Sequence, residues 1–138
     1  MYLVEKGLGA KALTLEERVE MNDIIKKIEE KYPECTSELL DNNEKAYQLW
    51  CKKQDDYGDG NIKLGLDISS SLSNKALSQL GVVIRMNDKV QRLLNIHKKN
   101  MFHNENVSVS DESIEDTCID LMNYANMLLA LSKDKWGK

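Results

Sequence analysis

The sequence predicts an all-α fold, a bundle of four to five helices with a long Gly- and Asp-rich loop between the second and third helices. The 138 residues include one proline and seven glycines, which leaves room for long uninterrupted helices. Aromatic residues make up only 6% of the chain, and apolar residues recur three and four positions apart. A chain of this length is expected to form a single helical domain, residues 14–138, preceded by an N-terminal arm, residues 1–13.

The first helix has a clear start and stop. Thr14 and Glu17 have the spacing of a capping box, in which each side chain hydrogen-bonds the backbone N–H of the other residue. The helix is therefore predicted to run from Leu15 to about Tyr32, where Pro33 ends it. A second helix is predicted from about Thr36 or Asn42 to Lys53, before the Gly- and Asp-rich loop.

The second half of the sequence indicates three more helices. Serines 69–71 can cap a short helix that runs to Leu80, and Gly81 is expected to separate it from a helix over residues 82–99. After a polar segment, Ser110 or Asp111 is expected to cap a last helix that runs to about Lys133.

Charge and cysteine content restrict the partners. The net charge is −4, and no dense basic tract is present, so duplex nucleic acid is not expected to bind directly. A small anionic ligand remains compatible with an acidic chain. No apolar run approaches the length of about twenty residues that crosses a bilayer, so no membrane partner is expected. Three cysteines without a CxxC pair and the lack of an export signal favour the cytoplasm.

Polar residues form a second ordered row on each of the last two helices. Helical spacing of three and four places Glu112, Asp116, Asp120 and Asn123 in one stripe of the last helix. Apolar and small residues form the opposite row of that helix: Ile114, Cys118, Leu121, Ala125, Leu128 and Ser132. Carboxylates four residues apart repel each other unless a cation lies between them. That cation is expected to be Lys89 or Arg92 on the preceding helix, or a metal ion.

Three segments of the chain carry a family resemblance. They are Asp56-Tyr57-Gly58, Arg85-x-x-Asp88-Lys89-x-x-Arg92-Leu93 and Glu112-Ser113-Ile114-x-Asp116-Thr117-x-x-Asp120-Leu121-x-Asn123-Tyr124-Ala125. Together they resemble the nucleotide modification associated domain family (first type), a group of small phage and bacterial proteins, over residues 44–131. The helices and acids also resemble, more weakly, MazG-like and all-α dUTP pyrophosphatases. The resemblance implies a role in nucleotide modification or metabolism, in the host cytoplasm if a phage encodes the chain.

The polar stripes suggest two kinds of site, and a solvated surface face is the alternative to both. In the first, Glu112, Asp116 and Asp120 hold magnesium, and Asp116 and Asp120 serve hydrolysis of a nucleotide's phosphates. In the second, cations bind the phosphates directly and carboxylates orient those cations. The residues expected to contact the nucleotide are Tyr57, Arg85, Asp88, Lys89, Arg92, Asn123 and Tyr124. Tyr57 is expected to stack on the base and Asn123 to bind a base or ribose.

A second set of acids has a simpler explanation. Glu16, Glu17 and Glu20, followed by Glu38 and Asp41, fit the metal signature of MazG-like pyrophosphatases. Glu16 and Glu17, however, are explained as first-turn and capping acids of the first helix. Trp50 and Trp136 are interpreted as packing residues.

The leading hypothesis is therefore a nucleotide-binding protein, and whether it is an enzyme stays open. One form is a magnesium-dependent nucleotide pyrophosphohydrolase. A second form sequesters a nucleotide signal without chemistry, and a third is a docking subunit of a base-modifying enzyme. In the first two forms the partner is a small nucleotide. The semi-polar helix faces also predict a homo-oligomer.

Overall fold

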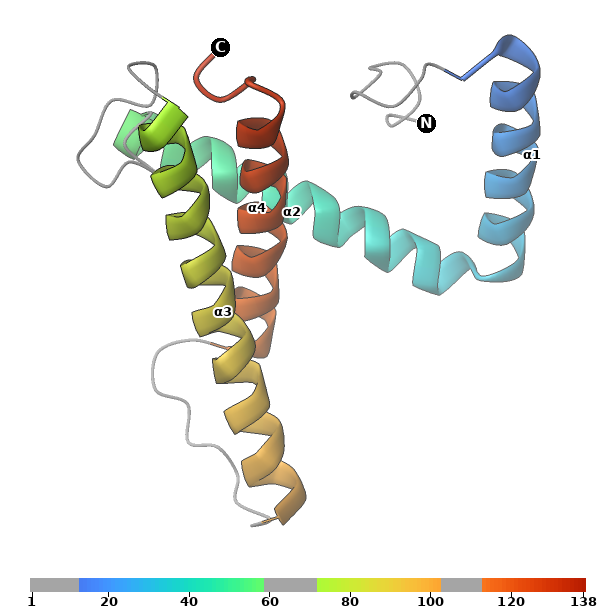
Figure 1. The fold of residues 1–138 in the computed structure, drawn as a ribbon. Helices are drawn as coiled ribbons and strands as arrows, with labels where there is room; N and C mark the ends of the chain where they lie inside the picture. The colour runs from blue at the N-terminus through green and yellow to red at the C-terminus, as the bar shows by residue number, and fades with distance from the viewer. Residues whose placement is uncertain (1–12, 59–71, 103–112) are drawn as a thin grey trace. The chain divides into compact units, whose positions relative to one another are not determined.

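The computed structural model describes residues 13–58, 72–102 and 113–138, and these residues form four α-helices and no strands (Figure 1). The helices are α1 (Leu15–Lys31), α2 (Pro33–Tyr57), α3 (Leu72–Phe102) and α4 (Ile114–Ser132). The prediction of an all-α fold is confirmed. The chain divides into two compact units, Met1–Glu44 and Lys45–Lys138, with the boundary inside α2. The predicted N-terminal arm lies almost entirely outside the described residues.

The start of α1 follows the prediction. The Thr14 hydroxyl accepts a hydrogen bond from the Glu17 N–H at 3.2 Å, and the Glu17 carboxylate accepts one from the Thr14 N–H at 2.7 Å. The helix ends at Lys31, with Tyr32 as its C-cap. This capping box satisfies two N–H groups that would otherwise lack a partner at the first turn.

α2 is longer at both ends than the sequence pattern predicts. Pro33 is its first residue, so the proline that ends α1 also begins α2, at a position where a helix needs no N–H donor. At the other end, α2 continues past Lys53 to Tyr57, and Gly58 follows with a positive φ of 56°. The first residues of the predicted loop are therefore helical, and most of that loop lies outside the described residues.

α3 corrects the prediction that Gly81 separates two helices. The helix continues through Gly81 from Leu72 to Phe102. A glycine in a helix interior costs about 1 kcal/mol relative to alanine. The next residue, Val82, is 1% exposed and belongs to the core, so tertiary packing on both sides of Gly81 outweighs that cost.

The cap of α4 differs from the prediction as well. Ser113 is the N-cap, and Asp116 completes a capping box with it, whereas Ser110 and Asp111 lie outside the described residues. The Ser113 hydroxyl accepts a hydrogen bond from the Asp116 N–H at 3.1 Å and donates one to the Asp116 carboxylate at 2.8 Å. The first turn of α4 is thus stabilised by two side chains that pair with each other.

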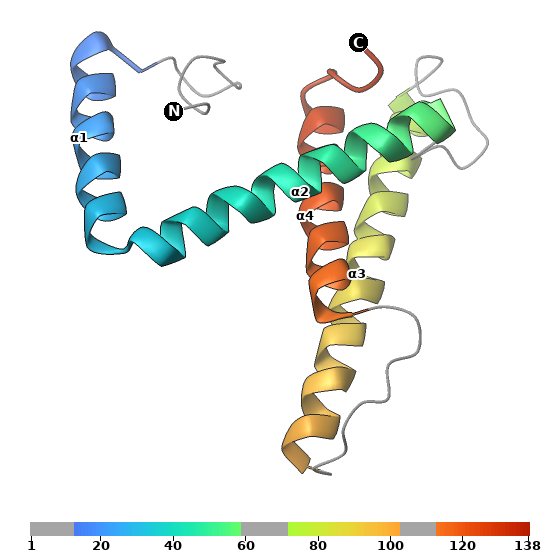
Figure 2. The same ribbon diagram turned by 180° about the vertical axis from the view of Figure 1, so that it is seen from behind.

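α3 and α4 lie side by side in both views of the ribbon, and they enclose the core of the second unit (Figures 1 and 2). The buried centre is Val82, Met127 and Leu131. Partly buried side chains pack around it: Trp50, Met86, Tyr124, Leu128 and Trp136. None of the helices within the described ranges is both long and apolar enough to span a bilayer.

The buried face of α4 is not the apolar row that the sequence predicts. Ile114 is 45% exposed and Cys118 is exposed, whereas Thr117 and Asn123 are buried. Thr117 can be fully buried because its hydroxyl donates a hydrogen bond to the Ser113 carbonyl at 2.9 Å. A polar side chain that satisfies itself within the helix behaves like an apolar one, which periodicity of residue types does not reveal.

The capping box of α4 yields the first prediction. Replacing Ser113→Ala removes the acceptor for the Asp116 N–H and should lower the free energy of unfolding by about 1 kcal/mol. Ser113→Thr keeps the hydroxyl and should cost much less. Urea unfolding followed by circular dichroism measures both. Equal losses for the two variants would contradict a capping role for the hydroxyl.

Candidate functional site

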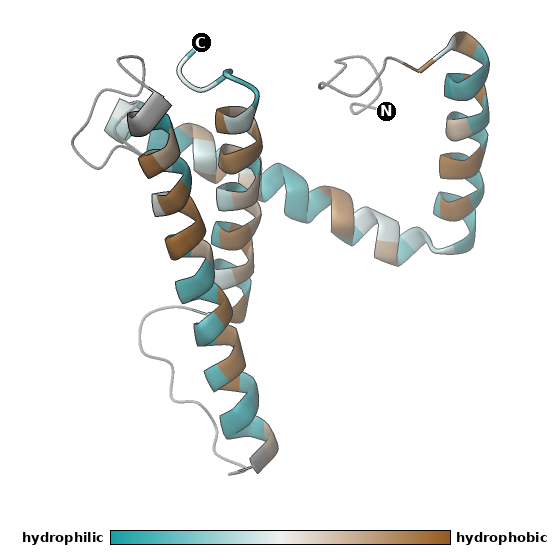
Figure 3. Ribbon diagram, in the orientation of Figure 1, coloured by the Kyte–Doolittle hydropathy of each residue, from teal (hydrophilic) through white to brown (hydrophobic). Residues whose placement is uncertain are grey.

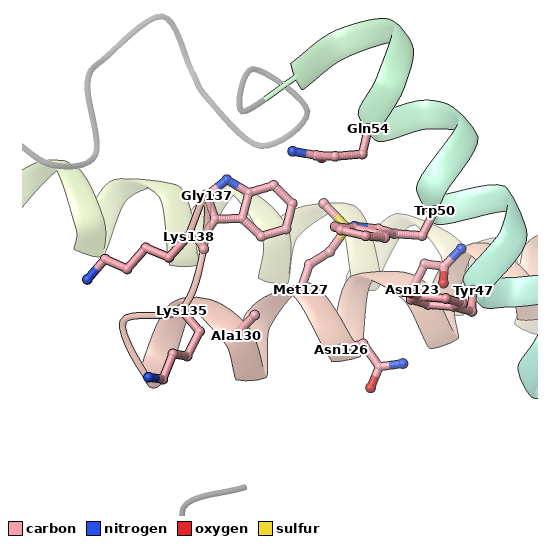
Figure 4. A pocket seen from close by; sticks show the side chains of 11 residues that line it. Tyr47, Trp50, Gln54, Asn123, Asn126, Met127, Ala130, Lys135, Gly137 and Lys138 are labelled. Carbon is pink, nitrogen blue, oxygen red and sulfur yellow. The ribbon is translucent and has the colours of Figure 1, made fainter. Parts of the chain in front are cut away.

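A cavity of about 580 Å³ lies between the second half of α2, α4 and the C-terminal segment (Figure 4). All of its lining residues belong to the second unit, Lys45–Lys138. Three aromatic side chains, three amides, two lysines and Met127 contribute most of the lining. Concave sites with mainly apolar walls and a few polar groups are where small ligands usually bind.

The aromatic wall comes from α2. Tyr47 and Trp50 are three residues apart, so they share one face of the helix. Their rings are stacked, with centroids 6.1 Å apart and planes 15° from parallel. The Trp136 ring meets the Trp50 ring edge-on, with centroids 6.1 Å apart and planes at 78°. Both arrangements are favourable for aromatic pairs.

Trp136 reaches this wall because of the way α4 ends. The Asp134 N–H donates to the Leu131 carbonyl at 3.1 Å, and the Lys135 N–H donates to the Ala130 carbonyl at 2.9 Å. This is the Schellman pattern, which reverses the chain direction and requires a left-handed residue. Asp134 takes that conformation, with a φ of 54°. The chain turns back there, so the Trp136 indole packs against the core that includes Met127 and meets the Trp50 ring.

An ion pair holds the same turn against α3. The Lys75 ammonium lies 2.6 Å from the Asp134 carboxylate. The hydrogen bond from Lys75, and then its charge, lower the pKa of Asp134. The pair is largely exposed on the Asp134 side, so its contribution to stability is small. It links the turn that precedes Trp136 to α3.

Two buried donors in the cavity lining have no hydrogen-bond acceptor among the described residues. They are Nδ2 of Asn123, whose residue is 7% exposed, and Nε1 of Trp136. A buried N–H without an acceptor costs about 1–3 kcal/mol. Asn123 comes from α4 and Trp136 from the C-terminal segment, so two independent elements each contribute a residue with an unsatisfied donor to the lining of one cavity.

Two lysines contribute positive charge to the lining of the cavity. The side chains of Lys135 and Lys138 extend from the C-terminal segment (Figure 4). Lysine ammoniums on flexible stems are suited to anionic groups that approach from solvent. The lining of the cavity therefore combines an aromatic wall, two unsatisfied donors and two lysines.

One turn before Asn123, Asp120 is the centre of an ion-pair network. Its two carboxylate oxygens accept hydrogen bonds from different helices, Oδ1 from Lys53 of α2 at 3.0 Å and Oδ2 from Lys89 of α3 at 2.9 Å. The side chains of Asp120 and Lys89 are 16% and 19% exposed. Lys89, Arg92 and a metal ion were the cations expected opposite the acidic stripe, and in the structure Lys89 pairs with Asp120 of that stripe.

The network determines how Asp120 titrates. Burial alone raises the pKa of its carboxyl group. The hydrogen bonds and charges of Lys89 and Lys53 together outweigh burial, and the pKa of Asp120 falls below its ordinary value of 3.8. Asp120 is therefore ionised at neutral pH and held between two cations.

The other predicted site residues lie elsewhere. Asp116 takes part in the capping box of α4, and Glu112 lies outside the described residues. Tyr57 is the last residue of α2 and is 66% exposed, away from the cavity lining. Tyr124 packs against the core.

The basic row of α3 does not line the cavity either. Arg85, Lys89 and Arg92 are half-buried on one side of the helix, and Asp88 is exposed. Within residues 13–58, 72–102 and 113–138, no group of three or more His, Cys, Asp or Glu side chains is arranged to hold a metal ion.

Sequence reasoning missed most of the cavity. Trp50 and Trp136 were expected to pack, with a subunit contact as the alternative for Trp136, and both do pack against the core. Their place in a cavity was not expected, and Tyr47, Gln54 and Asn126 were not singled out. The spacing of Tyr47, Trp50 and Gln54, three and then four residues apart, is the signal that could have found one wall.

A search of protein-family models, of curated proteins and of solved structures found no match to this chain.

The Asp120 network yields the second prediction. Asp120→Asn removes the charge shared by Lys53 and Lys89 and should lower the free energy of unfolding by about 1–3 kcal/mol at neutral pH. Because the folded-state pKa of Asp120 is lowered, this contribution is present above pH 3.8 and is lost as pH falls through the folded-state pKa.

The measurement is urea unfolding of both proteins over a pH series from neutral to acidic. The difference between them should shrink below about pH 4. Asp88→Asn is the control, because Asp88 is exposed on α3. A variant that is more stable than the native chain at neutral pH would mean that the acidic stripe is a repelling surface.

Proposed function

We propose that this chain binds a free nucleotide in the cavity between α2, α4 and the C-terminal segment. The observation that carries the proposal is the combination of a stacked aromatic wall, two unsatisfied buried donors and two lysines in the lining of one cavity. A nucleotide presents a planar ring, hydrogen-bond acceptors and anionic phosphates, so each part of the cavity has a counterpart in the ligand.

The base would contact the aromatic wall. A cavity of about 580 Å³ is within the range of about 300–1,000 Å³ that small-molecule sites occupy. Stacking of a base on an aromatic side chain is worth about 1–3 kcal/mol. Trp50 offers the largest ring of that wall, and Tyr47 supports it from the next turn of α2.

The edge of the base would supply the missing acceptors. Nδ2 of Asn123 and Nε1 of Trp136 can each donate to a carbonyl oxygen or ring nitrogen of a base. Binding would then convert two unsatisfied donors into satisfied ones, which favours a ligand with acceptors over an apolar ligand of the same size. The expectation that Asn123 contacts a base or ribose becomes part of this proposal.

The phosphates would lie near Lys135 and Lys138. The chain as a whole is acidic, with a net charge of −4, so its general field does not attract an anion. Two local cations in the lining of the cavity, Lys135 and Lys138, would supply the attraction instead. The basic row of α3, expected to bind phosphates, is not part of this cavity.

Binding without hydrolysis is the form that the geometry supports better. Each oxygen of Asp120 accepts a hydrogen bond from a lysine, and Asp116 holds the first turn of α4. In this arrangement both carboxylates already have other partners. Magnesium-dependent hydrolysis through Asp116 and Asp120, with Glu112, is the alternative. The family resemblance adds the proposal that the ligand belongs to nucleotide modification or signalling in a phage-infected cell.

The third prediction separates ligand binding from folding. Asn123→Leu keeps the branched side chain of four heavy atoms but has no donor, so the free energy of unfolding should stay the same or rise. Nucleotide affinity should fall by roughly tenfold, because one hydrogen bond to the ligand is worth about 1 kcal/mol or more.

Titration calorimetry against a panel of ribonucleotides and deoxynucleotides measures the affinity, and urea unfolding measures the stability. Asn95→Leu is the matched control, since Asn95 is exposed on α3 and outside the cavity. A loss of stability in Asn123→Leu, with nucleotide affinity unchanged, would show that the amide serves the fold and not the ligand. A chain that binds no nucleotide would favour a docking subunit.

The fourth prediction concerns chemistry. A nucleotide that binds should be recovered intact after incubation, with or without magnesium, when the mixture is analysed by chromatography. Conversion that requires magnesium, stops on addition of a chelator and is lost in Asp120→Asn would overturn binding without hydrolysis and establish the pyrophosphohydrolase.

A further inference from the structure

α3 carries an exposed row of residues with the spacing of a coiled coil. Positions alternate three and four residues apart from Ala76 to Met101, as in the a and d positions of a heptad repeat. The a positions are Leu80, Asn87, Leu94 and Met101. The d positions are Ala76, Val83, Val90 and His97. All eight residues of this row, the α3 seam, are exposed.

The α3 seam is separate from the face that packs on α4. Val82 and Met86 contribute to the core, and Lys89 pairs with Asp120 of α4. These residues are four and three positions apart and form their own row. Coloured by hydropathy, α3 shows apolar residues recurring along its length (Figure 3). α3 thus has two rows of residues. Within the described residues of the second unit, α4 covers the row of Val82, Met86 and Lys89, and the α3 seam is exposed.

The α3 seam is long enough for a stable contact between helices. From Ala76 to Met101 it runs about 38 Å at about 1.5 Å per residue, close to four heptads, and three to four heptads are sufficient for a coiled coil. Its large apolar side chains are substantially exposed, from 41% at Val90 to 76% at Met101. Apolar stripes of this extent on a protein surface usually mark an interface.

The area of the α3 seam can be compared with the area that each partner buries in a stable dimer. A helix about 10 Å wide contacted over about 38 Å offers a strip on the order of 400 Å² in projection, and side-chain relief increases the accessible area. A standard interface buries about 800 Å² per partner. Leu77 and Ile84, which are 44% and 52% exposed, lie at the neighbouring e positions and widen the strip toward that size.

The charge pattern favours an identical helix as the partner. Charged residues make up 30% of the chain, yet the α3 seam holds none, with histidine counted as neutral. When a helix pairs with a parallel copy of itself in register, each residue meets its own copy, so any charge in the seam would meet a like charge. A seam without charges meets this requirement for self-pairing.

Asn87 indicates the direction of pairing. It is the single amide in the middle of the seam, at an a position, where asparagine specifies register in coiled coils. In a parallel pair, a positions face a positions, and the two Asn87 amides can hydrogen-bond to each other. In an antiparallel pair, a positions face d positions, and Asn87 would be buried against Val90 without a partner.

We infer that α3 pairs with α3 of a second copy of this chain, parallel and in register, through the α3 seam. The inference is independent of the nucleotide proposal, because no residue of the seam lines the cavity. It gives the expected homo-oligomer a defined interface.

The fifth prediction tests the interface by mass. Sedimentation of the full chain should give twice the monomer mass of 15.8 kDa. Leu80→Glu and Leu94→Glu each place two carboxylates against each other and should give monomers with unchanged helical circular dichroism. Leu129→Glu is the matched control, since Leu129 on α4 is 53% exposed and Leu80 is 55% exposed, and it should remain a dimer.

A native chain that sediments as a monomer at high concentration would overturn the inference. A dimer that persists in both Leu80→Glu and Leu94→Glu would also overturn it, because the contact would then lie elsewhere, for example on the exposed apolar residues of α1.

Disulfide formation tests the direction. In a full chain with Cys35, Cys51 and Cys118 replaced by serine, Leu94→Cys should oxidise to a covalent dimer, because the two sulfurs meet at facing a positions. Val83→Cys should do the same at facing d positions. Cross-linking only between a Val83→Cys chain and a Leu94→Cys chain would show antiparallel pairing and overturn the register.

Discussion

The carboxylate of Asp120 is the interaction on which the arrangement of the second unit depends. It is shared between Lys53 of α2 and Lys89 of α3, so one side chain of α4 joins three helices. α3 and α4 pack side by side, and α2 crosses α4 where Trp50 also packs against the core (Figure 2). The exposed pair of Lys45 with Glu115 adds little stability. Asp120 lies one turn before Asn123, so the network connects α2 to the part of α4 that lines the cavity.

The parts that could be predicted from sequence are those set by near neighbours along the chain. The capping box at Thr14 depends on residues three apart, and the structure reproduces it. A partner for the acidic stripe was also predictable, because an ionised carboxylate such as Asp120 that becomes partly buried must be matched by a cation, and Lys89 was one of two residues available on the preceding helix. Asn123 was placed in the same stripe by its spacing, three residues after Asp120.

What could not be predicted depends on contacts between residues far apart in sequence. Gly81 has the local preference of a helix end, but packing of Val82 on α4 keeps the helix continuous. Thr117 looks polar, yet its hydrogen bond within α4 allows it to be buried, and the buried face of the helix shifts accordingly. Trp50 and Trp136 are separated by most of the second unit, and only the left-handed turn at Asp134 brings them together. None of these outcomes follows from periodicity.

The position of the tryptophans has an optical consequence. The chain has two tryptophans, and both line the same cavity, with their rings in edge-to-face contact. Essentially all of the indole emission of the native protein therefore originates at the cavity, and the near-ultraviolet dichroism carries the coupling between these two rings. A molecule that enters the cavity must perturb both signals at once, whereas an event at the α3 seam leaves them unchanged. The unlabelled protein thus carries its own spectroscopic reporter of cavity occupancy.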